Sequence, residues 1–169
     1  AQGLLRGPVR RRPAHVGVNA RGSHSITLDG DDIDPAWKEM RTAATLKALA
    51  AKPYDLLLTE TYPFGRRQFE FELASVLDTV KALDKPPLIA CSVRDILVPK
   101  NELWKEEWMA DKALAYYDRV LVHADPDFIT LADSFPFAHK VENLVRYTGY
   151  VMRAGDRPEP PEGRPTRAP

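Results

Sequence analysis

The residues that could carry out chemistry follow three short apolar runs, at residues 55–60, 88–93 and 119–123. If these runs are parallel strands, ligands bind beyond their carboxyl ends, where backbone N–H groups and the positive ends of the following helices also point. The candidate residues are therefore the polar side chains and the one glycine after each run. They are Glu60, Gly65, Arg66, Arg67, Ser92, Arg94, Asp95, His123 and Asp125.

The loop after the first run is the most informative of the three. Pro63 and Gly65 predict a tight bend that brings backbone close to a ligand, and the guanidinium groups of Arg66 and Arg67 suit phosphate or carboxylate. The alternative is that these arginines brace the start of the next helix by pairing with nearby acids. The acids in question are Glu70, Glu72 and Asp95.

His123 and Asp95 are the candidate catalytic residues. His123 ends its run, and an imidazole with an unperturbed pKa of about 6.5 suits proton transfer at neutral pH. Asp95, with Arg94 beside it as charge partner, could act as a base or orient a hydroxyl. Structural alternatives stay open for both: a hydrogen-bonded histidine at a strand end, and an aspartate that caps a turn.

Several site motifs are missing from the sequence. It contains no G-x-G-x-x-G after a strand, no P-loop lysine, no G-x-S-x-G elbow and no histidine pair with metal-ligand spacing. Cys91 is the single cysteine, which excludes an internal disulfide and a cysteine-based zinc cluster. We therefore expect no cofactor and no metal.

The charge and hydropathy of the sequence limit the classes of partner that we expect. Lysine plus arginine equals aspartate plus glutamate at 24 each, so no overall field favours nucleic acid. Four arginines lie within residues 6–12 and four within 153–167, where they either contact phosphate or lipid headgroups or form solvated tails. No apolar stretch approaches the roughly 20 residues that span a bilayer, and no signal-peptide pattern is present. We expect a cytoplasmic location, with peripheral membrane contact as an option.

The elements that must position these residues follow from the spacing. The three runs begin 33 and 31 residues apart, which is the length of a strand–helix unit and predicts an α/β fold with a doubly wound parallel sheet. Helical patterns are expected at 35–51, 68–83, 102–117 and, more briefly, 125–134, and a last strand at 144–151. The predicted organisation is an irregular segment at 1–34 with a weak strand at 15–18, a Rossmann-like domain at 35–151, and a proline- and arginine-rich linker or tail at 152–169.

Four blocks resemble a known family. TETYPFGRRQFEFEL (59–73), CSVRDILV (91–98), RVLVHADP (119–126) and YTGYV (147–151) resemble bacterial predicted glycosyltransferases of GT-B fold, which are similar to the lipid II-forming N-acetylglucosaminyltransferase. The resemblance covers roughly residues 28–151. It implies two Rossmann-like domains, with an acceptor site in the first and a nucleotide-sugar site in the second, and catalysis without a metal held by an acidic motif. The family's opening G-x-G-H-x-x-R loop has no counterpart here.

The resemblance makes the chain the N-terminal, acceptor-binding part of a glycosyltransferase that moves a sugar from a nucleotide-sugar to an acceptor hydroxyl. His123 and Asp95 would contact that hydroxyl, and the other candidates would orient polar or anionic groups. We expect the donor to bind through a missing second domain, the acceptor to be a sugar, lipid or small molecule, and the isolated chain to be inactive. The alternatives are a non-catalytic α/β binding or scaffolding module and a sugar-nucleotide epimerase.

Overall fold

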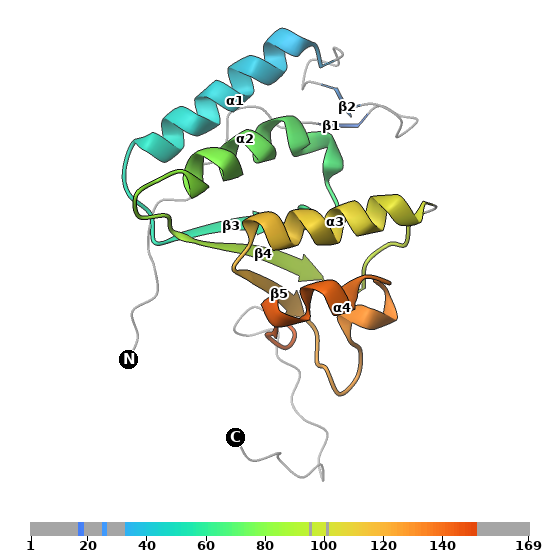
Figure 1. Ribbon diagram of the computed structural model, residues 1–169. Coiled ribbons are helices and arrows are strands. Elements are labelled where there is room, and N and C mark those ends of the chain that lie inside the picture. Colours follow the sequence, from blue (N-terminus) through green and yellow to red (C-terminus); the bar gives the residue numbers. More distant parts are fainter. Residues whose placement is uncertain (1–16, 19–24, 27–32, 95, 101, 152–169) are drawn as a thin grey trace, which may run out of the picture. The chain divides into compact units, whose positions relative to one another are not determined.

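The computed structural model describes residues 17–18, 25–26, 33–94, 96–100 and 102–151. Four strands form a parallel sheet in the order β3-β4-β5-β6, and helices accompany it in an α/β architecture (Figure 1). The strands are β3 (Leu56–Glu60), β4 (Leu88–Arg94), β5 (Arg119–His123) and β6 (Val145–Tyr147). Two further strands, β1 (Gly17–Val18) and β2 (Ser25–Ile26), form a separate antiparallel pair.

The helices are α1 (Pro35–Ala50), α2 (Glu70–Lys81), α3 (Leu103–Tyr116) and the short α4 (Ala138–Val141). A 3₁₀ turn at Arg67–Phe69 precedes α2, so the helix predicted at 68–83 begins as a tighter coil. Asp34 caps α1: its Oδ1 accepts a hydrogen bond of 2.6 Å from Trp37 N, and Pro35 occupies the first turn.

The chain divides into two compact units. One comprises Ala1–Pro53 and Gln68–Thr79, and therefore holds α1 and most of α2. The other comprises Tyr54–Arg67 and Val80–Pro169, and holds the parallel sheet, α3, α4 and all the loops that leave the strands at their carboxyl ends. The candidate site residues that the structure describes all belong to this second unit.

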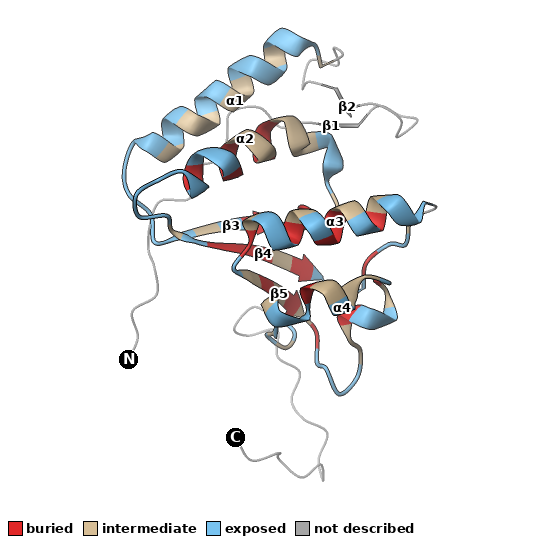
Figure 2. Cartoon of the chain, in the orientation of Figure 1, coloured by how far each residue is buried: buried red, intermediate tan, exposed pale blue. Residues whose placement is uncertain are grey.

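The core of the sheet-bearing unit lies between the strands and one face of α3. Ile89, Cys91 and Val93 alternate along β4 and are buried, as are Val120 and Val122 on β5. In Figure 2 the buried residues also follow one side of α3. That side has helical spacing and consists of Glu106, Met109, Ala110 and Ala113.

A doubly wound sheet is covered by helices on both faces, but Leu56 and Leu58 of β3 are half-exposed. The strands that the structure describes also run in sequence order, without the reversal that defines a doubly wound sheet. The parallel α/β architecture is thus confirmed, and the doubly wound arrangement stays a prediction.

The helix predicted at 125–134 is wrong. The carboxylate of Asp125 accepts a hydrogen bond of 3.0 Å from Asp127 N, which closes a turn instead of starting a helix. Thr130 and Asp133 then form a capping box for a 3₁₀ turn at Leu131–Asp133. The last strand is also shorter than predicted, because Gly149 adopts a φ of 69° soon after β6 and turns the chain.

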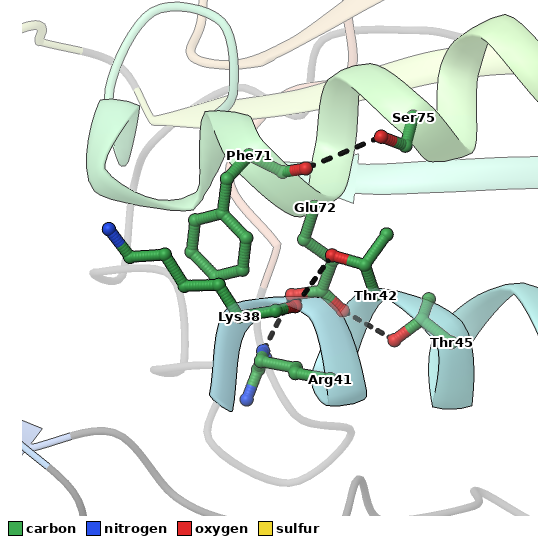
Figure 3. Close-up of polar contacts among 7 residues, drawn as sticks. All are labelled: Lys38, Arg41, Thr42, Thr45, Phe71, Glu72 and Ser75. Carbon is green, nitrogen blue, oxygen red and sulfur yellow. Dashed lines mark hydrogen bonds and ion pairs between the residues drawn. The ribbon is translucent and has the colours of Figure 1, made fainter. Parts of the chain in front are cut away.

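Helical spacing predicts a buried apolar face of Trp37, Met40, Ala44 and Ala48 on α1, but this prediction is wrong, since Met40 is 63% exposed and no residue of α1 is buried. The helix instead contacts α2 through a polar cluster (Figure 3). Arg41 Nε donates to Glu72 Oε2 at 2.6 Å, and Thr45 Oγ1 donates to Glu72 Oε1 at 2.5 Å. Trp37 adds an edge-on ring contact with Phe71 at 6.5 Å. The Glu72 side chain is fully buried, so this carboxylate holds the two helices together.

Candidate functional site at the carboxyl edge of the sheet

The sheet register brings the predicted residues of different strands side by side. Glu60 at the end of β3 pairs with Ser92 on β4, and Arg94 at the end of β4 pairs with His123 at the end of β5. Neighbouring strands lie about 4.8 Å apart, so these four side chains belong to one edge. The convergence expected from parallel topology is therefore confirmed for residues on three strands.

A cavity of about 260 Å³ opens at this edge. Four predicted residues line it: Glu60, Gly65, Arg66 and Arg94. The sequence did not single out the rest of the lining. That part comprises Thr61, the cation Lys100 and four apolar side chains, which are Phe64, Ile96, Leu97 and Val98.

The cavity combines apolar walls with an excess of positive charge. Glu60 is the one acid among the described lining residues, and Glu60 Oε1 lies 2.7 Å from Arg66 Nη2, which neutralises that pair. Within the described part of the chain, neither Arg94 nor Lys100 forms an ion pair with a carboxylate. An anionic group joined to an apolar body is the ligand chemistry that complements this lining.

The loop from β3 to α2 has the tight bend that Pro63 and Gly65 predicted. Thr61 N donates to Ser92 O at 2.8 Å, and Gly65 N donates back to Thr61 O at 3.1 Å. Thr61 and Arg66 hold φ values of 67° and 56°, in the left-handed region that disfavours a β-branched residue such as threonine. Gly65 is required by space, because a Cβ there would lie 2.8 Å from Thr61 Cγ2.

Two buried hydroxyl groups hold this loop in place through the carbonyl oxygen of Tyr62. The hydroxyls of Thr59 and Tyr117 lie 2.9 Å apart, and each lies 3.0 Å from the carbonyl oxygen of Tyr62. Burial raises the pKa of Tyr117 above its usual range, so the phenol keeps its proton as a hydrogen-bond donor. Burial also raises the pKa of Cys91 to about 12, which makes it an inert thiol of the core.

His123 is held by hydrogen bonds on both ring nitrogens. Nε2 lies 2.7 Å from Ser92 Oγ, and Nδ1 lies 2.7 Å from Thr148 Oγ1. The Thr148 hydroxyl also lies 3.0 Å from Gly149 O and 3.4 Å from Val122 O, carbonyls that can only accept, and donation to either one leaves a lone pair facing Nδ1. In that arrangement the ring carries its proton on Nδ1, and Nε2 accepts from the Ser92 hydroxyl. Sequence reasoning missed Thr148, although its place directly after β6 was a usable signal.

Arg67 and Asp125 are not among the residues that line the cavity. The Arg67 guanidinium lies over the rings of Trp104 and Trp108, at 5.2 and 4.9 Å from their centroids, and so braces the start of α3. Asp125 is exposed and caps its own turn. Asp95 lies outside the described residues. A binding role for these three residues stays a prediction.

In the ranges that the structure describes, no three histidine, cysteine, aspartate or glutamate side chains gather where they could hold a metal ion. The described helices include none with the length and apolar character needed to cross a membrane. Comparisons with protein-family models, curated proteins and solved structures found no match for this chain.

Proposed function

We propose that the chain is the N-terminal, acceptor-binding part of a GT-B glycosyltransferase with a Rossmann-like sheet. The observation that carries the proposal is the hydrogen-bonded row of Ser92, His123 and Thr148, beside a cavity with cationic groups at the same sheet edge. A sugar acceptor needs a group to take its proton and a surface to hold the rest of the molecule. This edge offers both.

The chemistry assigned to these residues is proton removal. In the transfer, the acceptor oxygen bonds to C1 of the donor sugar, the bond from C1 to the nucleotide's phosphate oxygen breaks, and the acceptor hydroxyl loses its proton. Ser92 Oγ receives that proton while its own proton passes to His123 Nε2, which the neutral ring leaves free to accept. Thr148 keeps the ring oriented for this role.

The cavity supplies orientation in this proposal. Arg94 and Lys100 bind an anionic group of the acceptor, and Phe64 and Val98 contact an apolar part. Arg66, held by Glu60, shapes the rim. The nucleotide-sugar would bind to a second domain, so donor recognition is assigned to residues beyond this chain.

The test uses the complete gene product, whose polypeptide size is measured first, and a panel of nucleotide-sugars with release of free nucleotide as the readout. His123→Gln and Ser92→Ala should lower the transfer rate, while His139→Gln, which changes an exposed histidine on α4, should leave it unchanged. Removal of a general base typically lowers rates about 10²–10⁴-fold. Full transfer by a folded His123→Gln protein refutes the assignment.

One observation favours a second candidate, a non-catalytic α/β binding module. Both nitrogens of His123 already have partners within the protein, which suits a structural histidine as well as a catalytic one. Under this function an anionic amphiphile binds the cavity without turnover. Arg94→Ala then weakens ligand binding, and no donor in the panel is consumed.

A further inference from the structure

Two acidic side chains are buried in the part of the chain that the structure describes, those of Glu72 and Glu106. A buried charge normally has an opposite charge beside it, because a desolvated carboxylate without one is costly. Glu72 has this partner in the Arg41 guanidinium, at 2.6 Å (Figure 3). Glu106 is 3% exposed, and no lysine, arginine or histidine among the described residues forms an ion pair with it.

The contacts of Glu106 offset only part of its charge. Oε1 accepts a hydrogen bond of 2.9 Å from Lys100 N, while Oε2 accepts none from a described donor. Glu106 also lies in the first turn of α3, and the amino end of a helix carries a partial positive charge of about 0.5. An amide hydrogen bond and a helix end supply less than a full opposite charge. A cation at Oε2 would complete the pairing.

Glu106 lines a second cavity, of about 310 Å³. This cavity lies between the segment that leads into α3 and the segment around the 3₁₀ turn at Leu131–Asp133. Leu97 N donates to Ser134 Oγ at 3.0 Å, and this bond ties the two segments together. Lys100 lines both cavities, so the second one adjoins the cavity at the sheet edge.

Acids outnumber cations in the lining of the second cavity. Its charged members are Glu106, Asp133 and Lys100, which leaves an excess of one negative charge. Hydrogen bonds from the backbone N–H and the hydroxyl of Thr130 lower the pKa of Asp133, so this exposed carboxylate is ionised at neutral pH. The lining therefore favours a cationic ligand.

Other charged side chains of α3 and α4 do not reverse this balance. Glu102 pairs with Lys105, and the Lys140 ammonium lies 2.7 Å from Glu107 Oε1 and 3.3 Å from Asp111 Oδ1. Each of these lysines thus has at least one acid beside it. The surroundings reinforce the negative charge of the cavity.

We propose that the second cavity binds a small organic ammonium ligand with an apolar chain. The ammonium donates a hydrogen bond to Glu106 Oε2 and serves as its counter-ion, and the chain packs against Leu103 and Phe135. Leu103 is 65% exposed, so a ligand that covers it buries apolar surface. An organic cation fits better than a metal ion, because the described residues contain no group of three side chains that could hold a metal. The inference does not depend on sugar transfer.

The experiment is a titration of the full, isotope-labelled chain with hexylammonium chloride, followed by the shifts of its backbone amide resonances at neutral pH and constant ionic strength. Hexanol and hexanoate are the uncharged and anionic counterparts of the same length. The amides of Lys100 and Ser134, which border the cavity, should shift and saturate with hexylammonium at concentrations at which neither counterpart has an effect.

Glu106→Gln keeps an acceptor for Lys100 N and removes the charge, so it should weaken hexylammonium binding about tenfold or more. Glu107→Gln is the matched control: it removes the next carboxylate along α3, which does not line the cavity, and should leave the affinity unchanged. Thermal unfolding gives a second readout. Without amine, Glu106→Gln should raise the Tm by about 2–4 °C, because a buried charge without a counter-ion is gone. Hexylammonium should raise the Tm of the unaltered protein and not that of Glu106→Gln.

Equal shifts with hexanol, unchanged affinity in Glu106→Gln, or an equal loss in Glu107→Gln would each overturn the proposal. So would a folded Glu106→Gln protein with a lowered Tm, because the protein itself would then already neutralise the carboxylate. A third measurement needs no variant and decides the case in which Glu106→Gln fails to fold. Nuclear Overhauser contacts should join the hexylammonium chain to Leu103 and Phe135 of the unaltered protein, and their absence at saturation refutes the site.

Discussion

Replacing Arg41 by alanine tests the polar contact between α1 and α2. Glu72 is fully buried, the Arg41 side chain is 9% exposed, and their atoms Oε2 and Nε are 2.6 Å apart. The Arg41→Ala variant would remove the ion pair of a buried carboxylate, to which the Thr45 hydroxyl still donates (Figure 3). Removing one member of a buried ion pair costs about 3–5 kcal/mol, because the other charge stays desolvated.

Two further effects change the loss of unfolding free energy that we expect for Arg41→Ala. The guanidinium also lies over the rings of Trp37 and Phe69, at 5.4 and 5.5 Å, and each such contact adds about 0.5–1 kcal/mol. Against this, the carboxylate can take up a proton or admit water once Arg41 is gone, which limits the penalty. We therefore expect a loss of about 3–5 kcal/mol, near the full stability of a small domain.

The assay combines urea denaturation, followed by circular dichroism, with hydrogen exchange of α1 and α2. Since both helices belong largely to one compact unit, amides of both should exchange faster in Arg41→Ala. The double variant Arg41→Met with Glu72→Leu should recover most of the loss, because apolar residues of similar size often replace a buried ion pair without penalty. A loss below about 1 kcal/mol for Arg41→Ala, or additive effects in the double variant, would refute the reasoning.

Three other variants test the loop and the core of the sheet-bearing unit. Gly65→Ala should lower the free energy of unfolding by about 1–3 kcal/mol through its contact with Thr61 Cγ2, and adding Thr61→Ser, which removes that methyl group, should restore it in urea denaturation. Tyr117→Phe should cost about 1–3 kcal/mol in the same assay, because Thr59 loses its buried hydroxyl partner. The raised pKa of Cys91, about 12 against 9.0, means that the folded thiol keeps its proton while the unfolded thiol ionises. Stability from this group should be complete below pH 9 and fall between pH 9 and 12, so Cys91→Ala should show a shallower loss over that range, and a thiol reagent should label Cys91 only upon unfolding.

The strands of the sheet could be predicted because each one is a short, nearly continuous apolar run. β3, β4 and β5 begin and end within one residue of the predicted limits, although Leu56 and Leu58 of β3 are half-exposed. α1 was predicted in extent but not in orientation. The face of α1 that contacts α2 is polar. The partner of Arg41 is Glu72, 31 residues further along the chain, so no local sequence pattern indicates this ion pair. Apolar periodicity instead favoured Met40, which is exposed.

At the site, too, the positions of the residues could be predicted from the sequence, but the partners of their side chains could not. Parallel strands fix where Glu60, Ser92 and His123 come together, and that followed from spacing alone. Which way Arg67 turns depends on Trp104, which a different helix contributes, and aromatic rings compete with a ligand for the same guanidinium. A sequence shows both residues and cannot rank these partners, because their relative placement is a tertiary property.

The register links the cavity to His123. Arg94, which lines the cavity, is the strand partner of His123, and within the described residues it forms no ion pair with a carboxylate. Under the proposed function, Arg94 and Lys100 bind the anionic group of the acceptor, while Ser92 and His123 take up the proton of its hydroxyl. Adjacent parallel strands deliver these residues to the same edge of the sheet, so the cavity and the histidine act on one acceptor as one site.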